Sequence, residues 1–210
     1  MRPKAIFIDW DGTLSGSRFW GHWNLNPSDQ IKYQQIQQVL FQNRHDLLRD
    51  WMLGFISHVT VLEYISKTTE IAYDELLREL RHSCENMHFL DKGVLDAIQE
   101  IRKQNVKVVI ATDNMDTFRH WTVPALKLHE HFDGIITSDT RGAMKANFHE
   151  DGTSMFFNHF FNLTGIKPQE TILIDDGINN KVVENLGMTF LHVTKENALG
   201  QYLAKITAQT

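Results

Sequence analysis

The sequence predicts an α/β protein, in which an open, doubly wound parallel sheet carries an all-helical insertion after its first strand. Two observations lead to this fold class. Five short apolar runs are spread along the chain, and helical patterns lie between the later ones. Residues 18–88, in contrast, show helical patterns and no convincing strand. Strands that alternate with helices are typical of a parallel sheet covered by helices on both faces.

The expected strands are short, and each ends in polar or acidic residues. Strands buried on both faces of a parallel sheet read as near-continuous apolar runs, and all five have this character. They cover residues 5–9, 106–112, 134–138, 171–176 and 189–193. The helical patterns between them cover residues 93–105, 153–165 and 179–187, and the last two end in glycine, a usual helix stop.

The segment 18–88 is better explained as an inserted helical bundle than as a loop. Apolar stripes at helical spacing run through residues 31–40, 47–56 and 76–84. A connection this long inside a compact α/β unit is not expected to lack structure of its own. The alternative is that these helices simply cover the sheet, but the later helices already suffice for that. We therefore expect two domains, with residues 1–17 and 89–210 forming the core and residues 18–88 the insertion.

Composition narrows the classes of function. The chain has 210 residues, 42% of them hydrophobic, and a formal net charge of −5, which argues against a basic nucleic-acid-binding surface. Cys84 is the single cysteine, so an internal disulfide is impossible and a reducing compartment is expected. The N-terminal apolar run is too short for a signal peptide, and no run is long enough to span a bilayer. We expect a cytoplasmic protein that acts on a small molecule, without nucleic acid or membrane as partner.

The first strand runs directly into two carboxylates, in Asp9-Trp10-Asp11-Gly12-Thr13. Residues alternate across a strand, so Asp9 and Asp11 should leave it on the same side. Two carboxylates this close repel each other, and a cation or a shared proton is the usual relief. One acid can then serve as nucleophile and the other as general acid and base. The alternative is a surface turn, because Asp and Gly are good turn residues.

Two later segments carry groups that suit a phosphate. Thr112 ends the second apolar run, and its hydroxyl with the following backbone N–H can donate to a phosphate oxygen. Its alternative role is a helix N-cap, and both roles can coexist at a helix start. Lys145 follows the third strand, although a lysine in a loop, taken alone, is usually solvated.

A second acidic strand end follows residue 174. Asp175 and Asp176 end the fourth apolar run, and such a pair beside the first acids would be poorly stable without a cation. Oxygen ligands of this kind suit Mg²⁺, whose coordination is often completed by substrate phosphate. The alternative is that the two acids cap the helix that follows.

In this order, the four segments are a specific combination. An apolar strand with DxDGT, a strand with Thr, a Lys, and a strand with DD together resemble the haloacid dehalogenase superfamily of aspartate-nucleophile hydrolases. The resemblance covers the N-terminal strand and roughly residues 90–193, including the segment HFDGIITSDTRGAMK before the lysine. It implies a Rossmann-like core, and the helical insertion resembles the family's cap domain in its most common position.

The resemblance also implies a role for each residue. Asp9 would be the nucleophile that forms an acyl-phosphate, and Asp11 would protonate the leaving oxygen and then activate water. Mg²⁺ would be held by the Asp9 carboxylate, the Asp11 backbone carbonyl and Asp176, with supporting positions at Asp175 and Asn180. The transferring phosphoryl group would be held by Thr112, the N–H of Asp113 and Lys145.

Asp11 favours a phosphatase over the other branches of the family. Members that displace halide have no leaving oxygen to protonate and typically lack this second acid. The alternatives are a dehalogenase, phosphonate hydrolase or phosphomutase on the same scaffold, or a catalytically idle member that binds a ligand or partner through its cap. The expected substrate is a small phosphorylated metabolite, and the oligomeric state stays open.

Two residues depart from the family pattern, and the roles of two further residues near the first motif are undecided. Ala146 follows the lysine where the family often has proline, and Asp113 stands where the family often has asparagine. We expect Asp113 to turn away from the phosphate and cap the next helix. Trp20 either lines the substrate entrance or anchors the cap, and by the same logic Arg18 is a candidate for meeting an anionic substrate.

Overall fold

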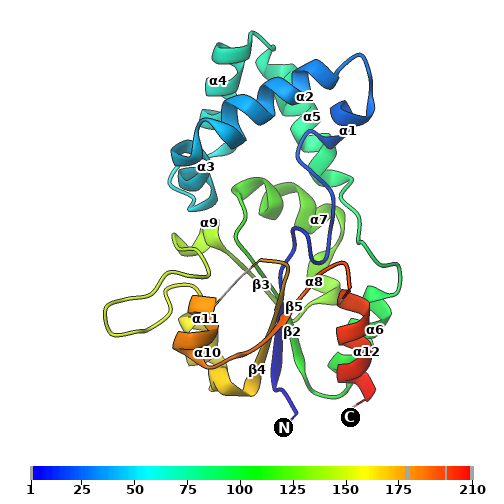
Figure 1. Ribbon diagram of the computed structural model, residues 1–210, viewed down its shortest axis with the longest axis vertical. Coiled ribbons are helices and arrows are strands. Elements are labelled where there is room, and N and C mark those ends of the chain that lie inside the picture. The colour runs from blue at the N-terminus through cyan, green and yellow to red at the C-terminus, as the bar shows by residue number, and fades with distance from the viewer. Residues whose placement is uncertain (1, 178–179, 197, 209–210) are drawn as a thin grey trace.

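The computed structural model describes residues 2–177, 180–196 and 198–208, with the side chain of Asn180 left out. Its centre is a five-stranded sheet in the order β3-β2-β1-β4-β5, and every pairing is parallel (Figure 1). The strands are β1 (Ala5–Ile8), β2 (Lys107–Thr112), β3 (Gly134–Thr137), β4 (Thr171–Asp175) and β5 (Thr189–His192). Each predicted strand is present, one residue shorter than expected, which is the usual uncertainty at element ends.

Helices cover both faces of the sheet, which confirms the doubly wound α/β fold. Alternate residues of β1 point to opposite faces, so Ile6 and Ile8 join one hydrophobic cluster and Phe7 joins another. The first cluster includes side chains of α6 (Val94–Lys103) and α12 (Leu199–Ala208), which lie together on one side of the sheet (Figure 1). The second lies under α11 (Asn180–Leu186) and the segment leading into α10 (Asn158–Thr164).

The remaining core elements are short. A π-helical turn, η2 (Phe118–Thr122), follows β2 and runs into α7 (Val123–Ala125). After these come α8 (Leu128–His131), α9 (Ser138–Arg141) and a 3₁₀ turn, η3 (Pro168–Glu170). No helix in the described part of the chain is long and apolar enough to cross a membrane.

Residues 18–88, all of them described, form helices and turns without a strand. The elements are α1 (Gly21–Leu25), α2 (Gln30–Ile36), the π-helical η1 (Gln37–Gln42), α3 (His45–Met52), α4 (His58–Thr69) and α5 (Tyr73–Glu85). They lie above the carboxyl ends of the strands (Figure 1). The division of the chain at residues 17/18 and 88/89 stays a prediction, and we call residues 18–88 the cap.

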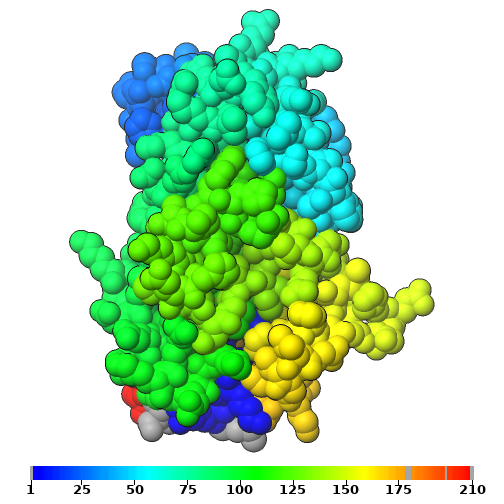
Figure 2. Space-filling model, turned by 180° about the vertical axis from the view of Figure 1, so that it is seen from behind, coloured from blue at the N-terminus to red at the C-terminus, as the bar shows by residue number. Residues whose placement is uncertain are grey.

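The cap is packed onto the core. Seen from behind, the cyan and teal cap segments lie directly on the green segment that follows β2 (Figure 2). One continuous hydrophobic cluster runs from Ile8 in the sheet, through Trp10 and Phe118, to Trp51 and Ile65 in the cap. The cap therefore covers the edge of the sheet at which the predicted functional residues lie.

Candidate active site

Three polar side chains meet at the carboxyl edge of the sheet because their strands are neighbours. Asp9 directly follows β1, Thr112 ends β2 and Asp175 ends β4. The sheet register pairs Ile8 with both Ile110 and Ile174, which brings the three strand ends to the same level. All three side chains are buried. Ligands of open α/β sheets bind at this edge, so the strands place these groups where chemistry is expected.

Lys145 reaches the same point from the loop after α9. Its Nζ lies 3.1 Å from Oδ1 of Asp9 and 2.5 Å from Oδ2 of Asp175. The residue is only 5% exposed, so a solvated loop lysine does not describe it. A buried ammonium between two carboxylates compensates their charge, and the three groups stabilise one another only as a set.

Burial dominates the electrostatics of the two N-terminal acids. It raises the pKa of Asp9 to about 7, an effect that Lys145 opposes and the charge of Asp175 reinforces. Burial also raises the pKa of Asp11 to about 6, against the opposing charge of Arg18. A carboxyl with a pKa near neutrality can both donate and accept a proton under ordinary conditions. Asp11 therefore has the acidity that a general acid and base needs.

The acids also fit a divalent cation. Carboxylate oxygens of Asp9, Asp175 and Asp176 all lie within 4.8 Å of one another. Oδ1 of Asp9 is buried and has no hydrogen bond, although Lys145 lies within ion-pair distance. An unsatisfied buried carboxylate oxygen beside two further acids is an arrangement that a hard cation such as Mg²⁺ relieves.

Asp176 has more freedom than Asp175 to take part in such a site. Oδ1 of Asp175 accepts the N–H of Gly177 and its Oδ2 contacts Lys145, so both oxygens are engaged within the protein. Asp176 is exposed and lies against Gly12, where an added Cβ would come within 2.0 Å of its Oδ2. Gly12 also has a φ of +74°, so a glycine is required there for two reasons. The side chain of Asn180, the other supporting position, lies outside the described residues.

The expectation that Asp113 would cap the next helix is wrong, whereas its turning away from the phosphate stays a prediction. Its Oδ1 instead accepts a hydrogen bond from the backbone N–H of Lys145, at 2.9 Å. The N–H at the start of the following helical segment, that of Met115, is bonded by the side chain of Asn114. Burial raises the pKa of Asp113, while the charge of Lys145 opposes the rise. Asp113 thus joins β2 to the loop that carries the lysine.

Trp20 and Arg18 lie in different surroundings. Trp20 is completely buried, and its two N–H groups donate to Oγ of Ser83 and to the carbonyl of Leu76. It anchors the first cap segment onto α5 and does not line an entrance. Arg18 is exposed, and its backbone carbonyl accepts the N–H of Gly21 at 3.0 Å, but its side chain makes no hydrogen bond or ion pair with any described residue. It lines a cavity next to Asp11.

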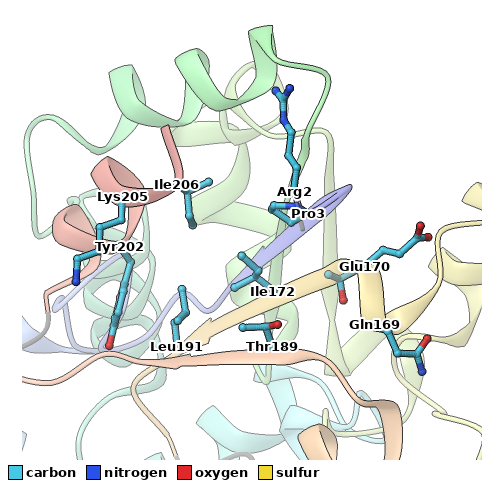
Figure 3. Close-up of a pocket in the computed structure, with 11 residues that line it drawn as sticks. Arg2, Pro3, Gln169, Glu170, Ile172, Thr189, Leu191, Tyr202, Lys205 and Ile206 are labelled. Atoms are coloured by element: carbon cyan, nitrogen blue, oxygen red, sulfur yellow. The ribbon is translucent and has the colours of Figure 1, made fainter. Parts of the chain in front are cut away.

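This cavity, of about 350 Å³, lies between Asp11 and Asp113 on the core side and helices α2, η1 and α3 on the cap side. Apart from Arg18, sequence reasoning did not identify the cap residues that line it. They are Phe19, Tyr33, Gln37, Phe41, Leu48 and Met52. Leu48 and Met52 belong to an apolar stripe that predicted a helix, and this pattern indicated burial but could not show that these side chains face a cavity. A second cavity, of about 310 Å³, lies at the opposite end of the strands and is lined by both aliphatic and polar or charged residues (Figure 3).

A further polar cluster, which the sequence also did not reveal, joins the cap to the core. Oδ1 of Asp116 accepts the indole N–H of Trp51 at 2.7 Å, and Oδ2 lies 2.7 Å from Nδ1 of His58. His120 stands close enough for its ring nitrogen to join this group. The hydrogen bonds from His58 and Trp51 outweigh burial and lower the pKa of Asp116. The participants are far apart in sequence, so only the packing of the cap brings them together.

Comparisons with known proteins agree with this geometry. A model of the family "haloacid dehalogenase-like hydrolase" matches residues 3–181. A glyceraldehyde 3-phosphate phosphatase of Methanocaldococcus jannaschii is 26% identical over 104 residues, which are 48% of this chain and 42% of that protein. The match therefore spans less than half of that relative.

Solved structures share the fold at low identity. A predicted HAD-like hydrolase from Porphyromonas gingivalis superposes with a TM-score of 0.71 at 19% identity, over 100% of this chain and 98% of that one. A HAD family enzyme from Bacteroides thetaiotaomicron, in complex with magnesium and inorganic phosphate, gives a TM-score of 0.66 at 18% identity, over 91% and 94%. With the family match over most of its length, the chain belongs to the haloacid dehalogenase-like hydrolases.

Proposed function

We propose that this chain is a Mg²⁺-dependent phosphatase that hydrolyses a small phosphorylated metabolite through an aspartyl-phosphate intermediate. The observation that carries the proposal is the second acid, Asp11, with its pKa raised to about 6 beside the buried Asp9. An ester oxygen needs a proton as it leaves, whereas a halide does not. The M. jannaschii relative named as a phosphatase and the solved complex with magnesium and phosphate support the same reading.

The metal would be held by the Asp9 carboxylate, the Asp11 backbone carbonyl and Asp176, with Asp175 and Asn180 in support. When bound, it would neutralise negative charge on the phosphoryl oxygens. The clustered carboxylates and the unbonded Oδ1 of Asp9 support this assignment.

The first chemical step belongs to Asp9 and Asp11. A carboxylate oxygen of Asp9 attacks phosphorus, forming an O–P bond while the bond from phosphorus to the leaving oxygen breaks. Asp11 gives its proton to that oxygen, so the product leaves as a neutral alcohol. The hydroxyl of Thr112, the N–H of Asp113 and the ammonium of Lys145 donate to the phosphoryl oxygens, where the transferred charge accumulates.

The second step restores the enzyme. Asp11, now ionised, takes a proton from a water molecule, which attacks the phosphorus of the aspartyl-phosphate. The bond between phosphorus and Asp9 breaks, inorganic phosphate leaves, and both acids return to their starting states. One group thus serves as acid and then as base, which a pKa near 6 allows at neutral pH.

The test is release of inorganic phosphate from phenyl phosphate by wild type and Asp9→Asn, each with Mg²⁺ and with a chelator. We expect the variant to lose roughly 10³-fold or more in kcat, as removal of a nucleophile does, and chelation to abolish the wild-type rate. Asp133→Asn is the control, because Asp133 pairs with Arg102 at the amino end of the sheet, away from the site. Equal phosphate release by wild type and Asp9→Asn would contradict the proposal.

A covalent intermediate gives a second readout. In Asp11→Asn the first step can still occur with a good leaving group, but no base activates water for the second. We expect this variant to carry one added phosphoryl group in its intact mass after exposure to phenyl phosphate, and Asp9→Asn to carry none.

A further inference from the structure

The cavity beside Asp11 has a composition that selects among phosphate esters. Its lining is mostly apolar or aromatic, and it faces the general acid on one side and the cap on the other. The apolar and aromatic members are Phe19, Tyr33, Phe41, Leu48, Met52 and Met115. We propose that the substrate is a phosphate monoester whose alcohol has a compact, largely apolar body, such as a single ring, and is not a polyol phosphate. This inference rests on the proposed phosphatase function, because it assigns the cavity to the leaving alcohol.

The cavity offers few hydrogen-bonding groups to an alcohol rich in hydroxyls. The hydroxyl of Ser17 already pairs with the ring of His88. Apart from the acids, this leaves the guanidinium of Arg18, the amide of Gln37 and the hydroxyl of Tyr33, none of which has a side-chain hydrogen bond to a described residue.

A polyol body would need partners that these groups cannot all supply. Each hydroxyl that loses water without finding a partner weakens binding by roughly ten- to a hundredfold. An apolar body has no such requirement and gains from leaving water. Arg18 can only donate, so apart from the acids only Gln37 and Tyr33 can accept hydrogen bonds from the hydroxyls of a substrate. The lining therefore favours a body that is mainly carbon.

The size and charge of the cavity further limit which alcohols can occupy it. A volume of about 350 Å³ is near the lower end for ligand sites, which fits one ring rather than a nucleotide. Asp11 and Asp113 both border it, and among the described residues that line it Arg18 is the one Lys or Arg. A body with several negative groups would therefore meet more repulsion than attraction.

The experiment compares esters whose leaving oxygen is in every case that of a primary alcohol, and which differ in the rest of that alcohol. Benzyl phosphate, cyclohexylmethyl phosphate and glucose 6-phosphate are all esters of a primary alcohol on a six-membered ring, but only the last is a polyol. With Mg²⁺ present, we expect kcat/KM of the wild type to be at least about tenfold higher for each apolar ester than for glucose 6-phosphate, as one unmatched hydroxyl already implies.

Two leucines of the cap provide a matched pair of variants. Leu48 and Leu77 are both half-buried and packed on the same cluster, but only Leu48 lines the cavity. Leu48→Asn places a polar group in the lining and should lower the preference for benzyl phosphate about tenfold, whereas Leu77→Asn should leave that preference unchanged.

The outcomes separate the two proposals. A wild-type rate with glucose 6-phosphate equal to or above the rates with the apolar esters would overturn this inference and leave the phosphatase function standing. Failure to release phosphate from all three esters and from phenyl phosphate would overturn the function, and this inference with it. If Leu48→Asn does not fold, the wild-type comparison alone decides.

Discussion

Replacing Lys145 with methionine tests how the buried acids of the site are held together. Methionine keeps an unbranched chain of similar length and removes the charge. In the wild type the ammonium lies 3.1 Å from Oδ1 of Asp9 and 2.5 Å from Oδ2 of Asp175, and its side chain is only 6% exposed. Without it, two buried carboxylates face each other with no compensating charge.

The magnitude follows from burial. Removing one partner of a buried ion pair typically costs about 3–5 kcal/mol of the free energy of unfolding. We expect a loss in this range for the metal-free variant at about pH 8, where Asp9, with a pKa of about 7, is mostly ionised in the wild type.

The loss should shrink at lower pH. The difference in the free energy of unfolding between wild type and variant changes with pH only where the two folded proteins bind different numbers of protons. Loss of the ammonium raises the pKa of Asp9 further, so near pH 8 the folded variant holds a proton that the wild type has released. Below the wild-type pKa both proteins are protonated at Asp9. Since one proton is worth about 1.4 kcal/mol per pH unit, we expect the loss to be smaller by at least about that amount at about pH 5.5.

The assay is urea denaturation of both proteins in a chelator at the two pH values. Lys32→Met is the matched control, because Lys32 also bridges two carboxylates, at 3.0 Å to Asp29 and 2.5 Å to Glu75, but its side chain is 34% exposed. Surface ion pairs contribute little, so this variant should change stability far less and with little dependence on pH. A Lys145→Met loss below about 1 kcal/mol at pH 8, or one that is equal at both pH values, would refute the reasoning.

Three further predictions concern neighbouring features. Mg²⁺ should raise the melting temperature more at about pH 8 than at about pH 5. The pKa values of Asp9 and Asp11 are raised by folding, so the metal-free protein loses stability as the pH rises through about 6 to 7. An equal rise in melting temperature at both pH values would contradict this. Gly12→Ala should weaken the Mg²⁺ response in a metal titration, because its Cβ would collide with Asp176; an unchanged midpoint would argue against a role for this contact. In Asp116→Asn, the free energy of unfolding measured with urea should fall less steeply as the pH is lowered below about 3.8. The reason is that a carboxyl whose pKa is lowered by folding gives stability that is lost on protonation. A decline as steep as that of the wild type would exclude this contribution.

The strands and their polar ends were predictable because the physics allows few alternatives. A run such as Ala5–Ile8, apolar at every position, can be satisfied only by burial on both faces. Once five such runs alternate with helices, parallel pairing places their carboxyl ends at one edge. Asp9, Thr112 and Asp175 therefore meet for reasons that the linear pattern already contains.

The cavity and the contact between cap and core could not be predicted in the same way. The apolar pattern shows that Leu48 and Met52 avoid water, but not whether they face a neighbouring helix or an open space. Asp116 and His58 are 58 positions apart in the sequence, and either would pass as a surface residue. Such contacts depend on how the cap packs on the core, and that arrangement is determined by many weak interactions together.

Asp113 shows how a departure from the family pattern can serve the same chemistry. A carboxylate beside a phosphate site would repel the substrate if both its oxygens faced inward. Here one oxygen is committed to the backbone N–H of Lys145, while the ammonium of the same residue is held by Asp9 and Asp175. The lysine is thus fixed at its backbone and at its charged end before any substrate arrives. Because charge stabilisation is most effective from groups that need not reorganise, the hydrogen bond that Asp113 accepts would, in the proposed phosphatase, help preorganise the lysine for a phosphoryl group.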